Sequence, residues 1–436
     1  MKALKLLQIG DIHYPDAKSG SGLADIKDKA MPSTLVDSLV PHKLQNVVRA
    51  LTKLCQPEKN EKRVNGILFC GDLTSMGNAS GYQECVRYLS EVLELSNPAV
   101  WRQDHIHAVP GNHDVDRTLC SPTNPSLFDK FRPLAVAWNN VAVPILQAEE
   151  IRRTTISADS CTAEVFSLNS CIGCGEKRFL PSKVGDELHR LLEKYVEGKR
   201  LDETFSLVGE QLDTPAFLEE HMTSLRLAID ELRPTTIPVV LAHHNILPQA
   251  IVRVDIYTEV INGGLIRSRL SQCKHPVIYC HGHIHDDPIE IISLPAPDNG
   301  PLVSISAPLL SDGFNLIEIW YGQKDIALGC VVVPYRIQRD GVVKRDDSKV
   351  VRISLRETGR YADLGDERIP SVLRYTSPQE YERFHEILAR VRGASSTHTQ
   401  ERSLAEPIWE AEWFGLVRIL DRAKDFKYWQ IQRITP

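Results

Sequence analysis

No stretch of this sequence approaches the roughly eighteen consecutive apolar residues that a membrane-spanning helix requires. The apolar run near the N-terminus turns polar at Asp11, so it is too short for the core of a secretory signal peptide. We therefore expect a cytoplasmic protein that makes no contact with a membrane.

An excess of positive charge is also absent. The 51 lysines and arginines are outnumbered by 57 aspartates and glutamates, and the formal net charge is -6 at pH 7. This balance argues against capture of nucleic acid by the whole surface, although a local basic patch is compatible with it. The chain has 436 residues, 42% of them hydrophobic, which is enough for a sizeable core and about two or three domains.

A cysteine framework is missing as well. Ten cysteines are scattered along the chain, and only Cys171 and Cys174 have the spacing of a metal or redox pair. No second pair follows at the distance of a zinc ribbon. We interpret the cysteines as free thiols in a reducing compartment, with a structural zinc or a redox role for this pair as the alternative.

Polar side chains follow three apolar runs in the N-terminal part of the chain. They are Asp11 and His13 after 5–9, Asp72 after 66–70, and Asn112, His113 and Asp114 after 105–109. Segments with helical spacing of apolar residues separate the runs, so strands and helices are expected to alternate. Ligands bind at the carboxyl ends of strands in open α/β sheets. The alternative for 111–114 alone is a surface turn, since turns favour Gly, Asn and Asp.

Histidines follow two further strand-like runs. The run 238–242 leads into His243 and His244, and the run 276–280 leads into His281, His283 and His285. Adjacent residues of an extended segment point in opposite directions, so only one of the first two is expected to be a ligand, and His243 is favoured because it follows the strand directly. His281 is expected to be a buried histidine or to support a ligand.

The collected side chains have the composition of a two-metal site. They comprise two carboxylates, one amide oxygen and four imidazoles: Asp11, His13, Asp72, Asn112, His243, His283 and His285. Mixed nitrogen and oxygen donors suit two divalent ions of manganese, iron, zinc or nickel better than calcium or magnesium. One carboxylate must bridge if the ions lie about 3.5–4 Å apart, as in two-metal hydrolases, where the pair activates a bridging hydroxide for in-line attack at phosphorus.

The order Asp-x-His, Gly-Asp, Gly-Asn-His-Asp, His and Gly-His-x-His resembles the calcineurin-like metallophosphoesterase superfamily, and all five motifs lie between residues 11 and 285. The resemblance implies a first metal held by Asp11, His13 and His285, a bridging Asp72, and a second metal held by Asn112, His243 and His283. It also implies that His113 assists catalysis at the leaving oxygen and that Asp114 orients His113.

The resemblance further implies an α/β fold, a four-layer α-β-β-α sandwich with an inserted helical segment and a small C-terminal module. We expect a catalytic domain at 1–338, a covering insertion at 115–235 and an accessory module at 339–436. Four strands are expected to form a meander that completes the second sheet, at 289–294, 302–307, 314–321 and 326–337. The segment 14–40 is expected to be a loop near the site, and 393–403 a linker.

The resulting hypothesis is a binuclear phosphodiester hydrolase, with manganese as the favoured metal and a nucleotide-type substrate, because the full Gly-Asn-His-Asp motif resembles the cyclic-nucleotide branch of the superfamily. One alternative is a DNA or RNA nuclease within a larger assembly, for which the arginines and lysines of 336–360 are a candidate patch. An alternative of another class is a non-catalytic scaffold that retains the fold. The aromatic tail at 406–436 is expected to pack on the domain or to mediate self-association or binding of a protein partner.

Overall fold

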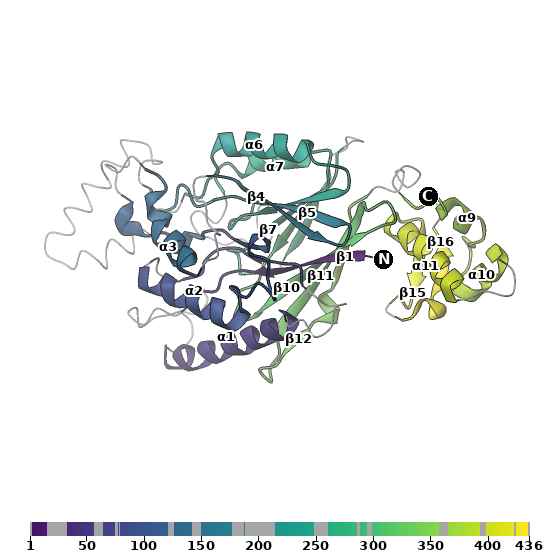
Figure 1. Ribbon diagram of the computed structural model, residues 1–436, viewed down its shortest axis with the longest axis horizontal. Coiled ribbons are helices and arrows are strands. Elements are labelled where there is room, and N and C mark those ends of the chain that lie inside the picture. The colour runs from purple at the N-terminus through teal and green to yellow at the C-terminus, as the bar shows by residue number, and fades with distance from the viewer. Residues whose placement is uncertain are drawn as a thin grey trace.

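The structure is a computed structural model. It describes residues 2–14, 33–55, 64–74, 77, 79–120, 126–141, 150–176, 187, 214–247, 260–285, 288–293, 299–356, 365–392, 398–422 and 424–434. Two large sheets face each other, with helices on both outer sides and a smaller module at one end (Figure 1). The expected four-layer α-β-β-α sandwich is therefore confirmed.

The first sheet has β1 near its centre. Its strands in spatial order are β12 (Val343–Arg345), β11 (Ala327–Ile337), β10 (Gly313–Tyr321), β1 (Lys2–Ile9), β2 (Gly66–Phe69) and β3 (Ile106–Ala108), with β13 (Val351–Ser354) also paired to β11. β1, β2 and β3 are parallel, whereas β10 runs antiparallel to β1. The carboxyl ends of β1, β2 and β3 consequently lie at the same edge of the sheet.

The second sheet repeats this arrangement. Its strands in spatial order are β4 (Arg152–Ala158), β5 (Cys161–Ser167), β6 (Thr236–Leu241), β7 (Val277–His281), β9 (Leu302–Ser306) and β8 (Ile289–Ile292). The central strands β5, β6, β7 and β9 are all parallel. Their carboxyl ends therefore also share one edge.

The alternation of side chains along β1 explains the layering. Leu4 and Leu6 point into the core between the two sheets, whereas Leu7 and Ile9 point into the core beneath the outer helices. The first sheet is covered by α1 (Ser33–Cys55), α2 (Ala79–Leu93) and α3 (Arg132–Asn140), and the second by α6 (Glu219–Asp230) and α7 (Gly263–Ser271). A strand buried on both faces needs apolar residues on both, and β1 supplies them at Leu4, Leu6, Leu7 and Ile9.

Three expectations differ from this architecture. The prediction that the meander completes the second sheet is wrong for β10 and β11, because β10 pairs with β1 and β11 pairs with β10 in the first sheet. The expected insertion at 115–235 contributes β4 and β5 to the second sheet, and its residues 177–186 and 188–213 lie outside the described residues. β12 and β13 extend the first sheet past 338. Alternating apolar residues indicate a strand but carry no information on which sheet it joins.

Two expected loops also differ. α1 already begins at Ser33, so the final part of 14–40 is helical, while 15–32 lies outside the described residues. Residues 398–403 of the expected linker belong to α11 (His398–Trp413). Within the described residues, no helix has the length and apolar character needed to cross a lipid bilayer.

The C-terminal module has its own small core. It contains α9 (Ile369–Arg374), β14 (Glu382–Arg383), α10 (Phe384–Arg392), α11, β15 (Val417–Leu420) and β16 (Gln430–Arg433). The aromatic tail packs back on the domain: the Trp413 ring lies against Gly329 of β11, and the Arg352 guanidinium lies 3.4 Å from its centroid. In Figure 1 this module adjoins the start of β1, at the opposite end from the strand ends that carry the predicted ligands.

Candidate metal centre

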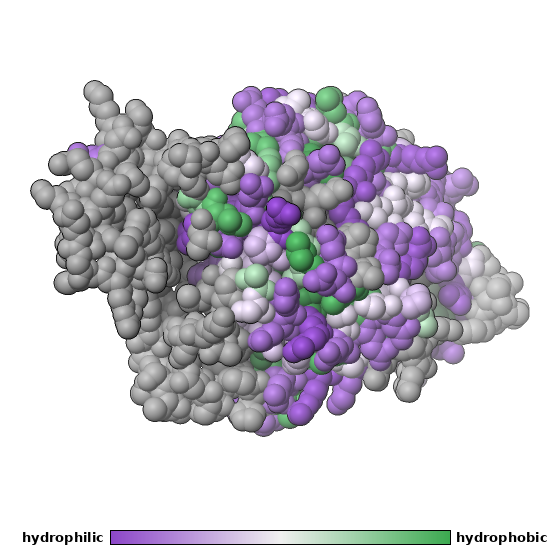
Figure 2. Space-filling model, turned by 60° about the vertical axis from the view of Figure 1, so that its left-hand side comes forward, coloured by the Kyte–Doolittle hydropathy of each residue, from purple (hydrophilic) through white to green (hydrophobic). Residues whose placement is uncertain are grey.

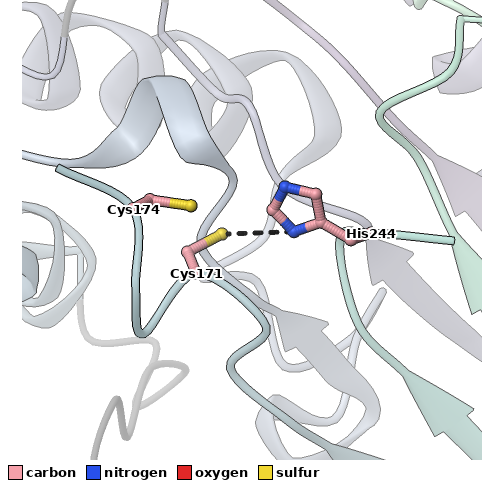
Figure 3. Close-up of side chains that lie close together, drawn as sticks. All are labelled: Cys171, Cys174 and His244. Atoms are coloured by element: carbon pink, nitrogen blue, oxygen red, sulfur yellow. Dashed lines mark hydrogen bonds between the residues drawn. The ribbon is translucent and has the colours of Figure 1, made fainter. Parts of the chain in front are cut away.

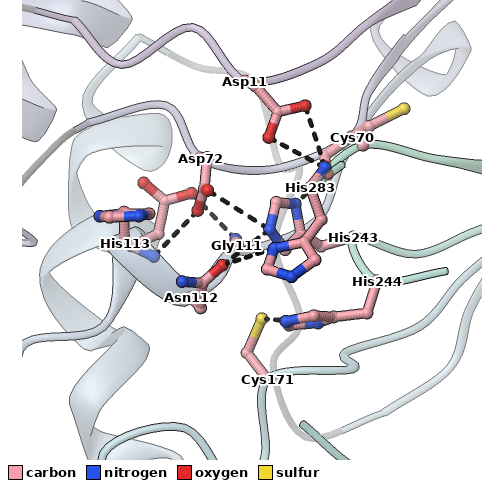
Figure 4. Close-up of polar contacts among 12 residues, drawn as sticks. Asp11, Cys70, Asp72, Gly111, Asn112, His113, Cys171, His243, His244 and His283 are labelled. Atoms are coloured by element: carbon pink, nitrogen blue, oxygen red, sulfur yellow. Dashed lines mark hydrogen bonds and ion pairs between the residues drawn. The ribbon is translucent and has the colours of Figure 1, made fainter. Parts of the chain in front are cut away.

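The predicted ligands come together where the two sheets present their carboxyl ends. In chain order they follow β1 (Asp11 and His13), β2 (Asp72), β3 (Asn112), β6 (His243) and β7 (His283 and His285). Figure 4 shows Asp72 between His113 on one side and His243 and His283 on the other. Seven side chains from five strands therefore meet in a single cluster, although the first and last are separated by 274 positions (285 minus 11).

One half of the cluster contains Asp11, His13, Asp72 and His285. Their donor atoms all lie within 4.8 Å of one another. His285 Nε2 is 3.4 Å from Asp11 Oδ1 and 3.2 Å from His13 Nε2. His13 Nε2 is in turn 3.8 Å from Asp72 Oδ2. Imidazole nitrogens and carboxylate oxygens that converge at these separations suit a divalent cation between them.

The other half contains Asp72, Asn112, His243 and His283. Asn112 Oδ1 lies 3.0 Å from His243 Nε2 and 3.1 Å from His283 Nδ1. His243 Nε2 is 3.4 Å from Asp72 Oδ2. Asp72 thus belongs to both halves, and the arrangement could hold two cations with this carboxylate between them. The division into two sets is the one that the sequence resemblance implies.

The adjacent histidines 243 and 244 point in different directions. The Nδ1 atom of His243 lies 2.8 Å from the Cys70 carbonyl oxygen, which leaves its Nε2 directed at Asp72 and Asn112. His244 instead places Nδ1 2.9 Å from Ser170 Oγ. The geometry therefore favours His243 as the ligand.

The support from Cys70 was missed by sequence reasoning. A backbone carbonyl is present in every residue, so no pattern could have identified this one. Another missed residue is Gln8, whose buried amide donates hydrogen bonds to the carbonyls of His281 and Ile305 and links β1 to β7 and β9. A polar residue inside an otherwise apolar strand was the available signal. His281 itself is buried, as expected.

The backbone at the centre is unusual. Nine non-glycine residues in the described part of the chain have a positive φ, and five of them are predicted ligands: Asp11, His13, Asp72, His283 and His285, with φ between 42° and 70°. Such conformations cost free energy for residues other than glycine and concentrate at functional sites. The strand ends thus turn sharply, which aims consecutive ligands into the same space.

Glycines permit the ligand loops to approach each other. A Cβ atom on Gly111 would lie 2.0 Å from Asp72 Oδ1, and a Cβ on Gly282 would lie 2.5 Å from Asp11 Oδ2. Both distances are far below contact separation, so a larger residue would displace a carboxylate. The glycines of the Gly-Asn-His-Asp and Gly-His-x-His motifs are therefore required by packing against the two aspartates.

The protonation states of Asp72, His13 and His283 suit cation binding, whereas that of His243 opposes it. Burial alone would raise the pKa of Asp72, but the facing His243 and His113 outweigh it and hold that pKa well below its ordinary value. Burial lowers the pKa of His13 to about 4 and that of His283 to about 3, which leaves both neutral. Burial acts on His243 in the same direction, but the Asp72 carboxylate overcomes it and raises the pKa to about 9. A cation at this position must therefore displace a proton.

His113 and Asp114 occupy different places. His113 is partly exposed, its backbone N–H donates to Asp72 Oδ1 at 2.9 Å, and its ring centroid lies 5.0 Å from that of His13. The buried Asp114 carboxylate accepts hydrogen bonds from the backbone N–H groups of Leu73, Thr74 and Gly111. Asp114 consequently ties the Asp72 loop to the Asn112 loop, while its orienting effect on His113 stays a prediction.

The fold and the cluster together define a metallohydrolase of the α/β sandwich class. A family comparison matches residues 4–287 to the calcineurin-like phosphoesterases. The chain belongs to this family of metallophosphoesterases. A comparison with curated proteins found no match.

Solved structures match the chain at low sequence identity. A dimetal phosphatase from Danio rerio is 13% identical, with a TM-score of 0.46, over 81% of this chain and 99% of that one. GAP50, described as an anchor in the inner membrane complex of Plasmodium, is 10% identical, with a TM-score of 0.43, over 81% and 89%. A 5'-nucleotidase precursor from Thermus thermophilus is 13% identical, with a TM-score of 0.38, over 81% and 55%.

Proposed function

We propose that this protein hydrolyses phosphodiesters of the nucleotide type with two divalent cations, manganese being favoured. The observation that carries the proposal is the pair of donor sets that share Asp72. These residues would hold two cations, which would supply activation of a water and neutralisation of the charge that develops on the phosphoryl oxygens. Four imidazoles beside two carboxylates and one amide oxygen support a first-row metal over magnesium.

The chain's own residues supply the rest of the chemistry. His113 stands at the rim beside His13 and Asp72, where its imidazole can donate a proton to the leaving oxygen of an ester. Proton donation matters most for the alkoxide leaving group of a diester, which is a poor leaving group when unprotonated. Asp114 holds the two loops that carry Asp72 and Asn112 and so acts as a positioning residue.

The surface supports a charged substrate. Where the structure describes it, the face in Figure 2 is mainly hydrophilic, and hydrophobic side chains form small, separated areas. A phosphate ester in water needs no extended apolar surface to bind, and its charge would be met chiefly by the cations. These features agree with a soluble nucleotide as substrate.

The test compares substrates on one preparation. Metal-stripped protein reconstituted with Mn²⁺ is assayed on a bis-aryl phosphodiester, an aryl phosphomonoester, a cyclic nucleotide and end-labelled DNA. Hydrolysis of the cyclic nucleotide, which has an alkoxide leaving group, is expected to fall about 10²–10⁴-fold in His113→Ala, whereas the bis-aryl diester, whose leaving group needs no proton, should lose less. Both activities should be unchanged in His385→Ala, which removes an exposed histidine of α10. Activity on the monoester alone would refute the phosphodiesterase proposal, and no activity on any ester would favour a scaffold.

A nuclease is the second candidate, and the C-terminal module favours it. Its order of helix, strand, two helices and a hairpin, with the sheet order β14-β16-β15, is that of winged-helix domains, many of which bind nucleic acid. This is an analogy of fold. The hairpin region 417–433 adds charge, with two acidic residues and five basic ones: Arg418, Arg422, Lys424, Lys427 and Arg433. Tyr428, 66% exposed, could stack on a base or contact a protein partner.

The two candidates differ in what the module must do. It lies at the far end of β1 from the metal centre, so only a long substrate could reach both (Figure 1). The double substitution Arg418→Glu and Lys427→Glu affects two exposed side chains of the hairpin. It is expected to weaken DNA cleavage in a nuclease while leaving bis-aryl phosphodiester hydrolysis intact. Equal activity on DNA before and after substitution would remove the support that the module gives to a nuclease.

A further inference from the structure

A second cluster of metal-binding side chains lies next to the candidate centre. Cys171 and Cys174 lie in the loop after β5, and His244 follows the neighbouring parallel strand β6. One donor atom from each residue lies within 4.8 Å of the other two, and Cys171 Sγ is 3.8 Å from His244 Nδ1. Figure 3 shows both sulfur atoms facing the edge of the imidazole ring. All three residues are buried.

The loop is shaped to present both thiols to one side. Cys174 N–H donates a hydrogen bond to the Cys171 carbonyl at 3.0 Å, which closes a tight turn. Gly175 continues the turn with a φ of +72°, a conformation that favours glycine. A Cβ on Gly173 would lie 1.9 Å from the Thr214 carbonyl oxygen, so the segment before α6 closes over this turn.

A buried ion pair holds the turn in place. Lys130 Nζ donates to the carbonyl oxygens of Ile172 at 2.6 Å and Cys174 at 2.8 Å, and it lies 3.3 Å from Glu176 Oε1. The side chains of Lys130 and Glu176 are both nearly inaccessible to solvent. Burying such a pair costs free energy unless each charge has hydrogen-bonding partners. The turn is therefore stabilised by several buried polar contacts.

His244 has an unused ring nitrogen. Its Nδ1 lies 2.9 Å from Ser170 Oγ, which fixes the orientation of the ring. Its buried Nε2 has no hydrogen-bond partner among the described residues. The nitrogen that faces the thiols is Nδ1, which lies 3.8 Å from Cys171 Sγ, so an ion held beside the two thiols would bind Nδ1 in place of the Ser170 hydroxyl.

From these observations we propose that Cys171, Cys174 and His244 bind a zinc ion, separate from the two cations of the catalytic centre. Two thiolates and one imidazole form a donor set known for zinc, with the fourth position left to a non-protein ligand. Binding Zn²⁺ releases the two thiol protons to solvent and forms two zinc–sulfur bonds. In the sequence, no second pair of cysteines accompanies Cys171 and Cys174 at zinc-ribbon spacing. The fold supplies His244 as the further ligand.

The zinc ion would support the catalytic ligands. The Cys171 thiol donates a hydrogen bond to the Pro110 carbonyl oxygen at 3.2 Å, and zinc binding would remove the proton that makes it, so the support would run through His244. His244 is adjacent in sequence to His243, and the ring centroid of His244 is 4.4 Å from that of His283. The ion would thus connect the loop after β5 to the segments that carry two ligands of one half of the centre.

Cobalt replacement distinguishes this site from the catalytic one. Cysteine thiolates bound to Co²⁺ produce a charge-transfer band in the near ultraviolet, which oxygen and imidazole ligands alone do not. The band is expected in the wild type, in Asn112→Ala and in Cys273→Ser, a buried cysteine outside the cluster. It is expected to be lost in Cys171→Ser and Cys174→Ser. A wild-type protein fully loaded with Co²⁺ that shows no such band would overturn the proposal.

A second measurement uses the wild-type chain, so its result does not depend on whether the cysteine variants fold. Wild-type protein loaded with zinc is treated with an organomercurial that blocks thiols, and released zinc is followed with a chromophoric chelator. Release of about one zinc ion per chain as the thiols react supports the site. Release of no zinc would show that the pair forms no zinc site. A count of eight rather than ten free thiols in the denatured, unreduced protein would show that the pair is a disulfide instead.

Discussion

Metal binding to this centre is expected to depend steeply on pH because of one imidazole. The pKa of His243 is raised to about 9 by the Asp72 carboxylate, although burial acts against it. Its Nε2, the atom that would bind a cation, lies 3.4 Å from Asp72 Oδ2 and 3.0 Å from Asn112 Oδ1. At pH 7 the metal-free protein therefore carries a proton where the cation must bind.

The magnitude follows from proton competition. Between pH 7 and the pKa of about 9, displacing one proton weakens the apparent affinity about tenfold per unit, or about 1.4 kcal/mol. The affinity for the cation in the half with His243 should thus rise about 100-fold from pH 7 towards pH 9 and level off above it. His13 and His283, with pKa values of about 4 and about 3, add nothing in this range.

The assay is calorimetric titration of metal-stripped protein with Mn²⁺ under anaerobic conditions. Titrations at pH 7 in two buffers of different ionisation enthalpy give the number of protons released, expected to be close to one for this cation. A chelator-competition series from pH 7 to pH 9 gives the affinity. An affinity for this cation that is constant across the series, with no proton release at pH 7, would refute the reasoning.

Three further substitutions test the centre and its surroundings. Asn112→Ala is expected to lower the bound metal from two ions per chain to about one and to reduce turnover at least 100-fold. Its circular dichroism spectrum should be unchanged. The control Asn139→Ala, which alters an exposed residue of α3, should retain both ions. Gly111→Ala should lower metal content and turnover, because its Cβ would lie 2.0 Å from a carboxylate oxygen of the shared aspartate. Gly264→Ala, with no atom within 4 Å of its Cβ, should retain both, and equal metal content in the two variants would contradict the packing argument. Lys130→Met should lower the free energy of unfolding in urea by about 3–5 kcal/mol, because it removes the cation that faces a buried carboxylate. A loss below about 1 kcal/mol would mean that the pair contributes little.

The position of each predicted ligand was accessible from the sequence because the signals are local. A short apolar run followed within a few residues by Asp, Asn or His marks the carboxyl end of a strand, and β1, β2, β3, β6 and β7 all end in this way. Alternation of strands with helices made those strands parallel and gathered their ends at one edge. These relations involve neighbours in the chain, so they need no knowledge of long-range contacts.

Sheet membership was not accessible in the same way. β10 and β11 have ordinary strand patterns, and either sheet could have accepted them. β10 pairs with β1 across more than three hundred positions, from Lys2 with Tyr321 to Gln8 with Asn315. Such pairing depends on which apolar faces remain uncovered after the parallel strands assemble, which local periodicity does not record.

The sequence by itself determined the chemistry of this protein: which carboxylates, imidazoles and amide could hold cations, and the family to which the order of motifs belongs. Only the tertiary structure decided which donors share Asp72, which way His243 and His244 point, and that Cys171 and Cys174 face His244. Residue type and spacing are properties of the chain, whereas the meeting of donors from separate loops depends on strand register and on backbone turns at the strand ends. Those turns are stabilised by hydrogen bonds between the loops, such as that from His283 N–H to Asp11 Oδ1, and by packing between the two sheets.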